Sequence, residues 1–174
     1  MHKQQKGSDH MSEKKKEKPT HLTKAGLQHY QELLDYLKGA KTIEIADRLE
    51  TARGFGDLSE NSEYDEAKEA QRENEAEKAR IEAILSNYIL IDEDSDTSTV
   101  KMGHIVVLYD CDYDEEDEYY LVGSSEADPL KGKISNESPV GAAILGHTKG
   151  ETITVKTPGG ESKYIIKDIR MADN

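Results

Sequence analysis

The sequence lacks several features that define large classes of protein. Its 174 residues include no tryptophan, one phenylalanine and one cysteine, Cys111. A lone cysteine cannot form a disulfide within the chain, and no apolar stretch approaches the roughly 20 residues of a membrane-spanning helix. We therefore expect a cytoplasmic protein with no membrane contact.

The chain also lacks the apolar content of a large enzyme core. Hydrophobic residues make up 34% of the sequence and charged residues another 34%. This composition favours long solvated helices beside a small core, and the length allows one ordinary domain or two compact ones.

Positive charge is scarce. Lysine and arginine number 23 against 36 aspartate and glutamate, which gives a net charge of −13. Phosphate binding requires clustered basic residues that release counterions, so the chain should not bind nucleic acid by itself. A protein partner or a metal ion is the expected target of so many carboxylates.

Common catalytic and metal-binding motifs are missing as well. There is no Gly-x-Ser-x-Gly sequence and no phosphate-binding loop, and the histidines are not spaced as zinc ligands. The acidic segment 110–118 resembles a calcium loop, but Glu115 stands where that loop needs glycine and Leu121 where it needs glutamate. We interpret this segment as a solvated hairpin loop.

Four segments follow from the changes in composition along the chain. Residues 1–20 look like an expression-tag remnant followed by a charged, disordered tail. Residues 92–99, with the sequence DEDSDTST, lack periodicity and form a predicted linker. The linker separates a helical region, 21–91, from a region with strand patterns, 100–174.

The helical region contains two series of apolar residues at heptad spacing. The first begins after Thr23, a predicted N-cap, and should end near Arg53, because glycine at positions 54 and 56 closes helices. The second series starts at Tyr64 and continues to Tyr88. Two long helices with a short connection must fold back antiparallel, which predicts a coiled-coil hairpin with its tip at residues 54–64.

The seam of this hairpin contains polar residues, namely Gln71, Asn74 and Lys78. They could fix the register of the two helices at a cost in stability. The alternative is that the middle of the hairpin is loosely packed.

The second region shows strand patterns at residues 104–109, 118–122, 151–156 and 162–169. Ser138 is a predicted N-cap and Gly146 a helix stop, so residues 139–145 should form a short helix across the sheet. The predicted fold class is α+β: a long N-terminal hairpin and a small antiparallel sheet with one helix.

Two acidic residues, Asp57 and Glu60, lie at the predicted tip. Their spacing fits a capping box, in which both side chains cap the second helix and have no further function. Alternatively, the two carboxylates share a divalent ion such as Mg²⁺, which takes one or two protein carboxylates. Two carboxylates alone make a weak site, so a metal site here would be completed in a complex.

Three separated motifs resemble one protein family. They are ARGFGDLSENSEYDEAKEAQ at 52–71, ISNESPVGAAILG at 134–146 and VKTPGG at 155–160. In this order they resemble the GreA/GreB family of transcript-cleavage factors, and the likeness runs from about residue 21 to 169. It implies an antiparallel coiled coil followed by a domain of FKBP-like fold.

The resemblance also implies a function. Such a factor binds bacterial RNA polymerase through the secondary channel and stimulates cleavage of the 3′ end of backtracked nascent RNA. Asp57 and Glu60 would be the catalytic and metal-binding residues, holding Mg²⁺ jointly with polymerase, whereas the isolated protein would hold none. The chain would be a monomeric accessory factor and not itself an enzyme. Its expected partner-contacting residues are Arg53, Asn61 and Tyr64 near the tip, and Glu137, Ser138 and Pro139 in the second region.

Two other functions remain open at this point. A channel-binding inhibitor would use the same hairpin without cleavage. A peptidyl-prolyl isomerase or chaperone would use the FKBP-like fold, although the second region has no tryptophan or phenylalanine to line an aromatic pocket. Arg53 also has two interpretations, as an RNA contact or as an ordinary solvated residue.

Overall fold

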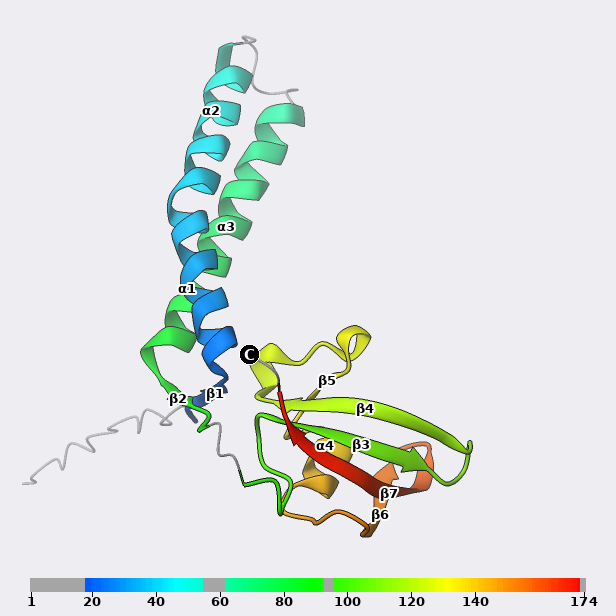
Figure 1. Cartoon of the computed structure of the whole chain (residues 1–174). Helices are drawn as coiled ribbons and strands as arrows, with labels where there is room; N and C mark the ends of the chain where they lie inside the picture. The colour runs from blue at the N-terminus through cyan, green and yellow to red at the C-terminus, as the bar shows by residue number, and fades with distance from the viewer. Residues whose placement is uncertain (1–17, 55–61, 93–95, 173–174) are drawn as a thin grey trace, which may run out of the picture.

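The computed structural model describes residues 18–54, 62–92 and 96–172 (Figure 1). A long helical hairpin extends away from a smaller lobe built on a curled β-sheet, which confirms the predicted α+β class. The predicted site residues Asp57, Glu60 and Asn61 lie outside the described residues.

The first arm of the hairpin consists of two helices, α1 (Lys24–Lys38) and α2 (Ala40–Gly54), where the sequence predicted one. The break falls at Gly39, whose backbone angles (φ −95°, ψ −101°) leave the helical region. Its N–H still donates to the carbonyl of Asp35. Figure 1 shows α1 and α2 following one another along the same side of the hairpin, opposite α3 (Ser62–Ser86).

The break coincides with a buried polar residue of the seam. Asn74 is 6% exposed, and its Nδ2 donates to the carbonyl of Leu37 at 3.3 Å and to Thr42 Oγ1 at 3.2 Å. The other two polar seam residues are half-buried and pair within α3, Gln71 with Lys68 and Lys78 with Glu75. Asn74 therefore makes the specific contact between the arms that the register interpretation requires.

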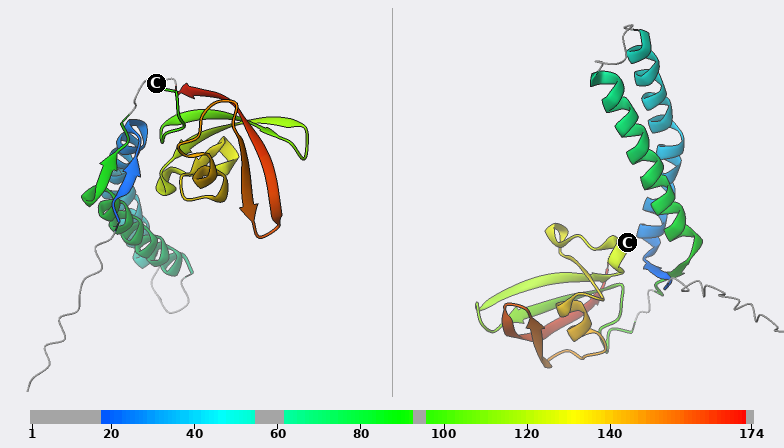
Figure 2. Two further views of the ribbon diagram at one scale, coloured as in Figure 1. Left: turned by 90° about the horizontal axis from the view of Figure 1, so that it is seen from below. Right: turned by 180° about the vertical axis from the view of Figure 1, so that it is seen from behind.

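The second helix ends earlier than its heptad pattern predicted. α3 stops at Ser86, and Tyr88–Leu90 forms the strand β2, which pairs in parallel with β1 (Thr20–Leu22). Asn87 accepts a hydrogen bond from the backbone N of Thr20, so tertiary pairing overrides the helical pattern at this point. Figure 2 shows the two strands side by side at the base of the hairpin.

The C-terminal lobe contains five strands in the order β5-β4-β3-β7-β6. The four predicted strands are present, but the sequence analysis missed β5, whose parallel pairing with β4 makes the sheet mixed and not purely antiparallel. The predicted helix is α4 (Pro139–Ile144), and the sheet curls around it (Figure 2). The strands are β3 (His104–Asp110), β4 (Glu115–Val122), β5 (Lys133–Ser135), β6 (Thr152–Thr157) and β7 (Gly160–Met171).

Two 3-10 turns lie between β4 and β5, η1 (Ser124–Glu126) and η2 (Pro129–Lys131). The lobe has one hydrophobic core, because alternate residues of its strands face α4. Its buried members are Val100, Val106, Leu108, Leu121, Ile144, Ile153, Val155, Ile166 and Ile169.

The acidic segment 110–118 is mostly strand, since β4 begins at Glu115. The predicted hairpin loop is therefore shorter than expected, and it lies between Asp110 and Glu115. Asp110 Oδ1 accepts hydrogen bonds from the backbone N of Asp112 at 2.8 Å and of Tyr113 at 3.2 Å. Its carboxylate thus has a structural role in the turn.

Candidate functional site

The neck of the hairpin tip brings together two predicted site residues. Arg53, in the last turn of α2, holds its guanidinium 5.8 Å from the ring centre of Tyr64, in the first turn of α3. The Tyr64 ring also packs against the buried cluster of Ile45, Leu49 and Ala67. A cation–π contact on an anchored ring therefore joins the two arms where the tip begins.

The acidic pair itself belongs to the seven residues between these two helix ends. Asp57, Glu60 and Asn61 lie outside the described residues, so both the capping and the metal interpretations stay predictions. The first turn of α3 carries Glu63 and Asp65, which suit the positive end of the helix dipole. The same dipole would favour carboxylates placed just before this turn.

The surface beside the neck is acidic. A hollow of about 500 Å³ lies between α2 and α3, and its lining residues are Glu44, Asp47, Arg48, Thr51, Glu63 and Glu66. Four carboxylates against one arginine repel phosphate groups. Further along α3, Lys68 bonds to Gln71 and Arg72 to Glu69. Arg53 is thus the described basic residue nearest the tip along α2, and its contact with RNA stays a prediction.

A second group of predicted residues forms a compact loop in the other lobe. Ser138 Oγ accepts from the backbone N of Gly141 at 3.1 Å and donates to the carbonyl of Ser135 at 2.7 Å, which confirms Ser138 as the N-cap of α4. Pro139 is the first helical residue, as predicted. Glu137 Oε2 accepts from Ser124 Oγ at 2.7 Å. Residues 137–139, which we call the docking loop after their predicted role, are thus fixed by hydrogen bonds while Glu137 and Pro139 are exposed.

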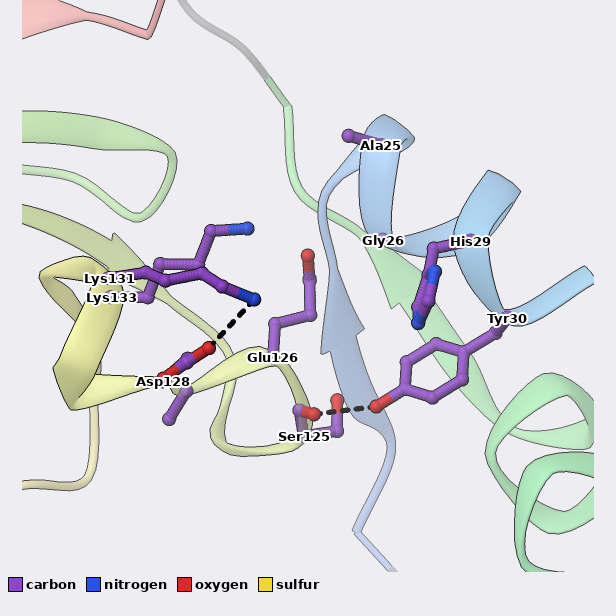
Figure 3. Close-up of a pocket in the computed structure, with 10 residues that line it drawn as sticks. Ala25, Gly26, His29, Tyr30, Ser125, Glu126, Asp128, Lys131 and Lys133 are labelled. Atoms are coloured by element: carbon purple, nitrogen blue, oxygen red, sulfur yellow. Dashed lines mark hydrogen bonds and ion pairs between the residues drawn. The ribbon is translucent and has the colours of Figure 1, made fainter. Parts of the chain in front are cut away.

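The sequence analysis missed the residues that join the two lobes. Both carboxylate oxygens of Glu126 accept from Thr23, one from its backbone N at 2.7 Å and the other from its hydroxyl at 2.6 Å. Tyr30 donates its hydroxyl to the carbonyl of Ser125 (Figure 3). These partners are 103 and 95 residues apart and have no characteristic spacing, so no pattern in the sequence indicated them.

A hollow of about 380 Å³ lies beside this junction (Figure 3). Its charged side chains have mixed signs, and Lys131 pairs with Asp128 at 3.1 Å. Within residues 18–54, 62–92 and 96–172, no group of three or more histidine, cysteine, aspartate or glutamate side chains could hold a metal ion. Nor does any helix in these ranges have the length and apolar content needed to cross a membrane.

The described geometry defines a two-lobed protein with a curled sheet in one lobe and a projecting hairpin in the other. Two family models together match nearly all of these residues. "Transcription elongation factor, N-terminal" matches residues 20–89, and "Transcription elongation factor, GreA/GreB, C-term" matches residues 95–171. The chain belongs to the GreA/GreB family of transcription elongation factors, which confirms the resemblance found in the sequence.

Individual relatives agree with this assignment. Transcription elongation factor GreA of Caldanaerobacter subterraneus subsp. tengcongensis is 51% identical over 154 residues, covering 88% of this chain and 98% of that protein. GreA of Clostridium perfringens (strain SM101) is 45% identical over 155 residues, with the same coverage. A crystal structure of GreA factor homolog 1 from Thermus thermophilus is 28% identical, with a TM-score of 0.40, covering 88% of this chain and 99% of that one.

Proposed function

We propose that this factor binds bacterial RNA polymerase and uses Asp57 and Glu60 to stimulate cleavage of the 3′ end of backtracked nascent RNA. One observation carries the proposal. The acidic pair belongs to the seven residues that follow α2 and precede α3 in the sequence, and the end of α2 and the start of α3 lie at the end of the hairpin remote from the C-terminal lobe (Figure 1). Membership of a family of transcription elongation factors supports polymerase as the partner.

The shape of the molecule suits two separate roles, attachment to polymerase by the C-terminal lobe and reach into its active site by the hairpin. The 25 residues of α3 rise by about 1.5 Å each, so this arm is about 37 Å long. A factor held at the polymerase surface by the docking loop could therefore reach a deeply buried active site with the tip. The exposed side chains of Glu137 and Pro139 are the residues of that loop most accessible to a partner.

The chemistry of the tip fits magnesium as a shared ion. Aspartate and glutamate supply the oxygen ligands that Mg²⁺ prefers, but two carboxylates leave most of its octahedral positions to water and to a partner. Held beside a second metal ion supplied by the partner, such an ion would help to stabilise the attacking and leaving oxygens of a phosphodiester cleavage. The contribution of this chain is to hold two ionised carboxylates at the end of a stiff arm, and polymerase performs the reaction.

Neutralising the pair should abolish stimulation without abolishing binding. We expect Asp57→Asn and Glu60→Gln each to lower the rate of RNA cleavage in stalled, backtracked polymerase complexes by about 100-fold or more, the loss seen when one electrostatic stabiliser is removed. The measurement is the release of short 3′ fragments from labelled RNA at saturating factor. Polymerase affinity, measured in parallel by competition, should change little.

Glu63→Gln is the matched control, because Glu63 is an exposed acid in the first turn of α3 that we assign no part in cleavage. It should leave cleavage within about two-fold of wild type, since exposed charges outside a site interact weakly. If wild type binds polymerase but releases no fragments, the chain is a channel-binding inhibitor. Equal losses in all three variants would show a general effect of charge.

A further inference from the structure

The 3-10 turn η1 contacts two separate parts of the molecule through three consecutive residues. Ser124 bonds to the docking loop through Glu137, at 2.7 Å. Ser125 accepts from Tyr30 of α1 through its carbonyl, and Glu126 accepts from Thr23. One short turn therefore connects the loop at which we place polymerase docking to the base of the hairpin that carries the tip.

The contact of Glu126 with Thr23 is the strongest of the three. Thr23 is 2% exposed and caps α1 by accepting from the backbone N of Gly26 at 2.9 Å. Its own N–H and hydroxyl both point outward to the Glu126 carboxylate. Hydrogen bonds to a charged acceptor are stronger than neutral ones, and a carboxylate suits the positive end of a helix. Glu126 thus acts as an additional cap on α1, supplied by the other lobe.

Two glycines allow this close approach. A Cβ atom at Gly26 would lie 2.1 Å from Oε1 of Glu126, and one at Gly123 would lie 2.0 Å from the carbonyl oxygen of His21. Both distances are far below van der Waals contact. Glycine within a helix is unfavourable, so its presence at position 26 has a packing reason, namely the seat of the Glu126 carboxylate.

We propose that Glu126 is a positioning residue, which fixes the direction of the hairpin relative to the docking loop and so places the acidic tip in the polymerase. The inference rests on the proposed function for its effect on cleavage. The fixed orientation itself is a property of the free protein. The two parts are therefore tested by separate measurements.

The orientation is tested by a distance measurement in the free, full-length chain. One spin label attaches to Cys111, the only cysteine of the sequence, which is exposed in the C-terminal lobe. The second attaches to a cysteine introduced by Glu73→Cys at an exposed position of α3. We expect one narrow distance peak, which Glu126→Ala replaces by a broad distribution with its mean shifted. Circular dichroism checks that both lobes stay folded.

Glu32→Ala is the matched control, because Glu32 is an exposed glutamate of α1 whose carboxylate accepts, among the described residues, from Gln28 of the same helix. It should keep the narrow peak. An unchanged peak in Glu126→Ala would overturn the proposal, whether or not the chain stimulates cleavage.

A double variant separates the contact from general damage. Gly26→Ala should displace the Glu126 carboxylate and lower the melting temperature of the otherwise native chain. In the Glu126→Ala background the same change should raise the melting temperature, because alanine is the better helix former and the clash is gone. A fall in the melting temperature of the same size in both backgrounds would show that the Glu126 carboxylate does not require glycine at position 26.

The functional part is tested with polymerase at saturating factor. We expect Glu126→Ala to keep its affinity but to lower cleavage by roughly 10- to 100-fold, the scale of a displacement of about 1 Å at a reacting centre. Normal cleavage with a broadened distance distribution would overturn the link to cleavage. A wild-type chain without cleavage would refute the proposed function, and the distance measurement would still decide the orientation.

Discussion

The two lobes bury their hydrophobic residues in different ways. The C-terminal lobe buries nine hydrophobic residues in one continuous cluster. The hairpin has two smaller clusters instead, one around Ile45, Leu49 and Ala67 and another around Leu22, Tyr30, Leu37 and Ile81. Asn74 lies in the seam near the break at Gly39 that interrupts the first arm. A curled sheet can enclose one core, whereas a long two-helix arm must be stabilised by separate clusters along its length.

Removing one core leucine from each lobe gives the largest test of this difference. Leu108 is 1% exposed in the sheet and Leu49 is 8% exposed in the hairpin. Leu108→Ala should lower the free energy of unfolding by about 4 to 5 kcal/mol, and Leu49→Ala by about 2 to 3, because a two-helix seam can close over the lost side chain. Denaturant titration measures both values.

Amide hydrogen exchange would show which strands and helices each substitution destabilises. Leu108→Ala should accelerate exchange in all five strands together, while Leu49→Ala should affect α2 and the facing part of α3. Leu130, 99% exposed on η2, gives the control, and Leu130→Ala should change stability by less than about 0.5 kcal/mol. Exchange that accelerates through both lobes in either variant would mean that the molecule unfolds as one unit.

The sequence predicted the elements that depend on a pattern within one segment, and it did not predict those that depend on contacts between segments. Periodicity predicted the hairpin and four strands, and capping residues predicted α4, because each rests on a pattern of a single segment. The break at Gly39 has no such pattern, since a lysine–glycine–alanine sequence is tolerated inside helices and the break is accompanied by contacts of Asn74 from the other arm. β2 continues the heptad of α3, and only its pairing with β1 turns it into a strand.

Prediction of the candidate site was limited in the same way. The spacing of the acidic pair singled it out, and capping signals singled out Ser138 and Pro139, but the roles of these residues and of the neck residues came from resemblance to a family. The described ones form two ordered groups. Glu126 was missed, because its partner Thr23 is 103 residues away and the bond depends on how two lobes meet. Long-range hydrogen bonds of this kind have no signal in a single sequence.

Asn74 offers a smaller test, confined to the hairpin. Its Oδ1 is buried and has no hydrogen-bond partner among the described residues, which is destabilising. Asn74→Leu should therefore raise the free energy of unfolding of the hairpin by about 1 kcal/mol. The carbonyl of Leu37 keeps one donor, the hydroxyl of Thr42 at 2.7 Å. Denaturant titration gives the value, and hydrogen exchange in α2 and α3 assigns it to the hairpin.

A fall in stability in this variant would instead show that the bonds from Nδ2 to Leu37 and Thr42 outweigh the unsatisfied oxygen. Asn74 would then hold the two arms together without the cost in stability that the register interpretation includes. Asn74→Asp serves as the control, since it keeps the shape and buries a charge. It should destabilise the hairpin under either interpretation.

The smallest expected effect is a loss of stability of the C-terminal lobe at alkaline pH. Burial, together with a hydrogen bond to Asp110, raises the pKa of Tyr164 in β7 to about 12. The folded lobe thus favours the neutral phenol, whose pKa is about 10 when the chain is unfolded. This contribution to stability is complete below about pH 10 and is lost as pH rises from about 10 to 12.

Tyr164→Phe should reduce the drop in the urea midpoint over this pH range. Tyr113→Phe is the control, because Tyr113 is 76% exposed in the β3–β4 turn, and it should leave the drop as in wild type. An equal drop in the urea midpoint of the wild type and of Tyr164→Phe would mean that other groups cause the loss of stability of the C-terminal lobe in alkali.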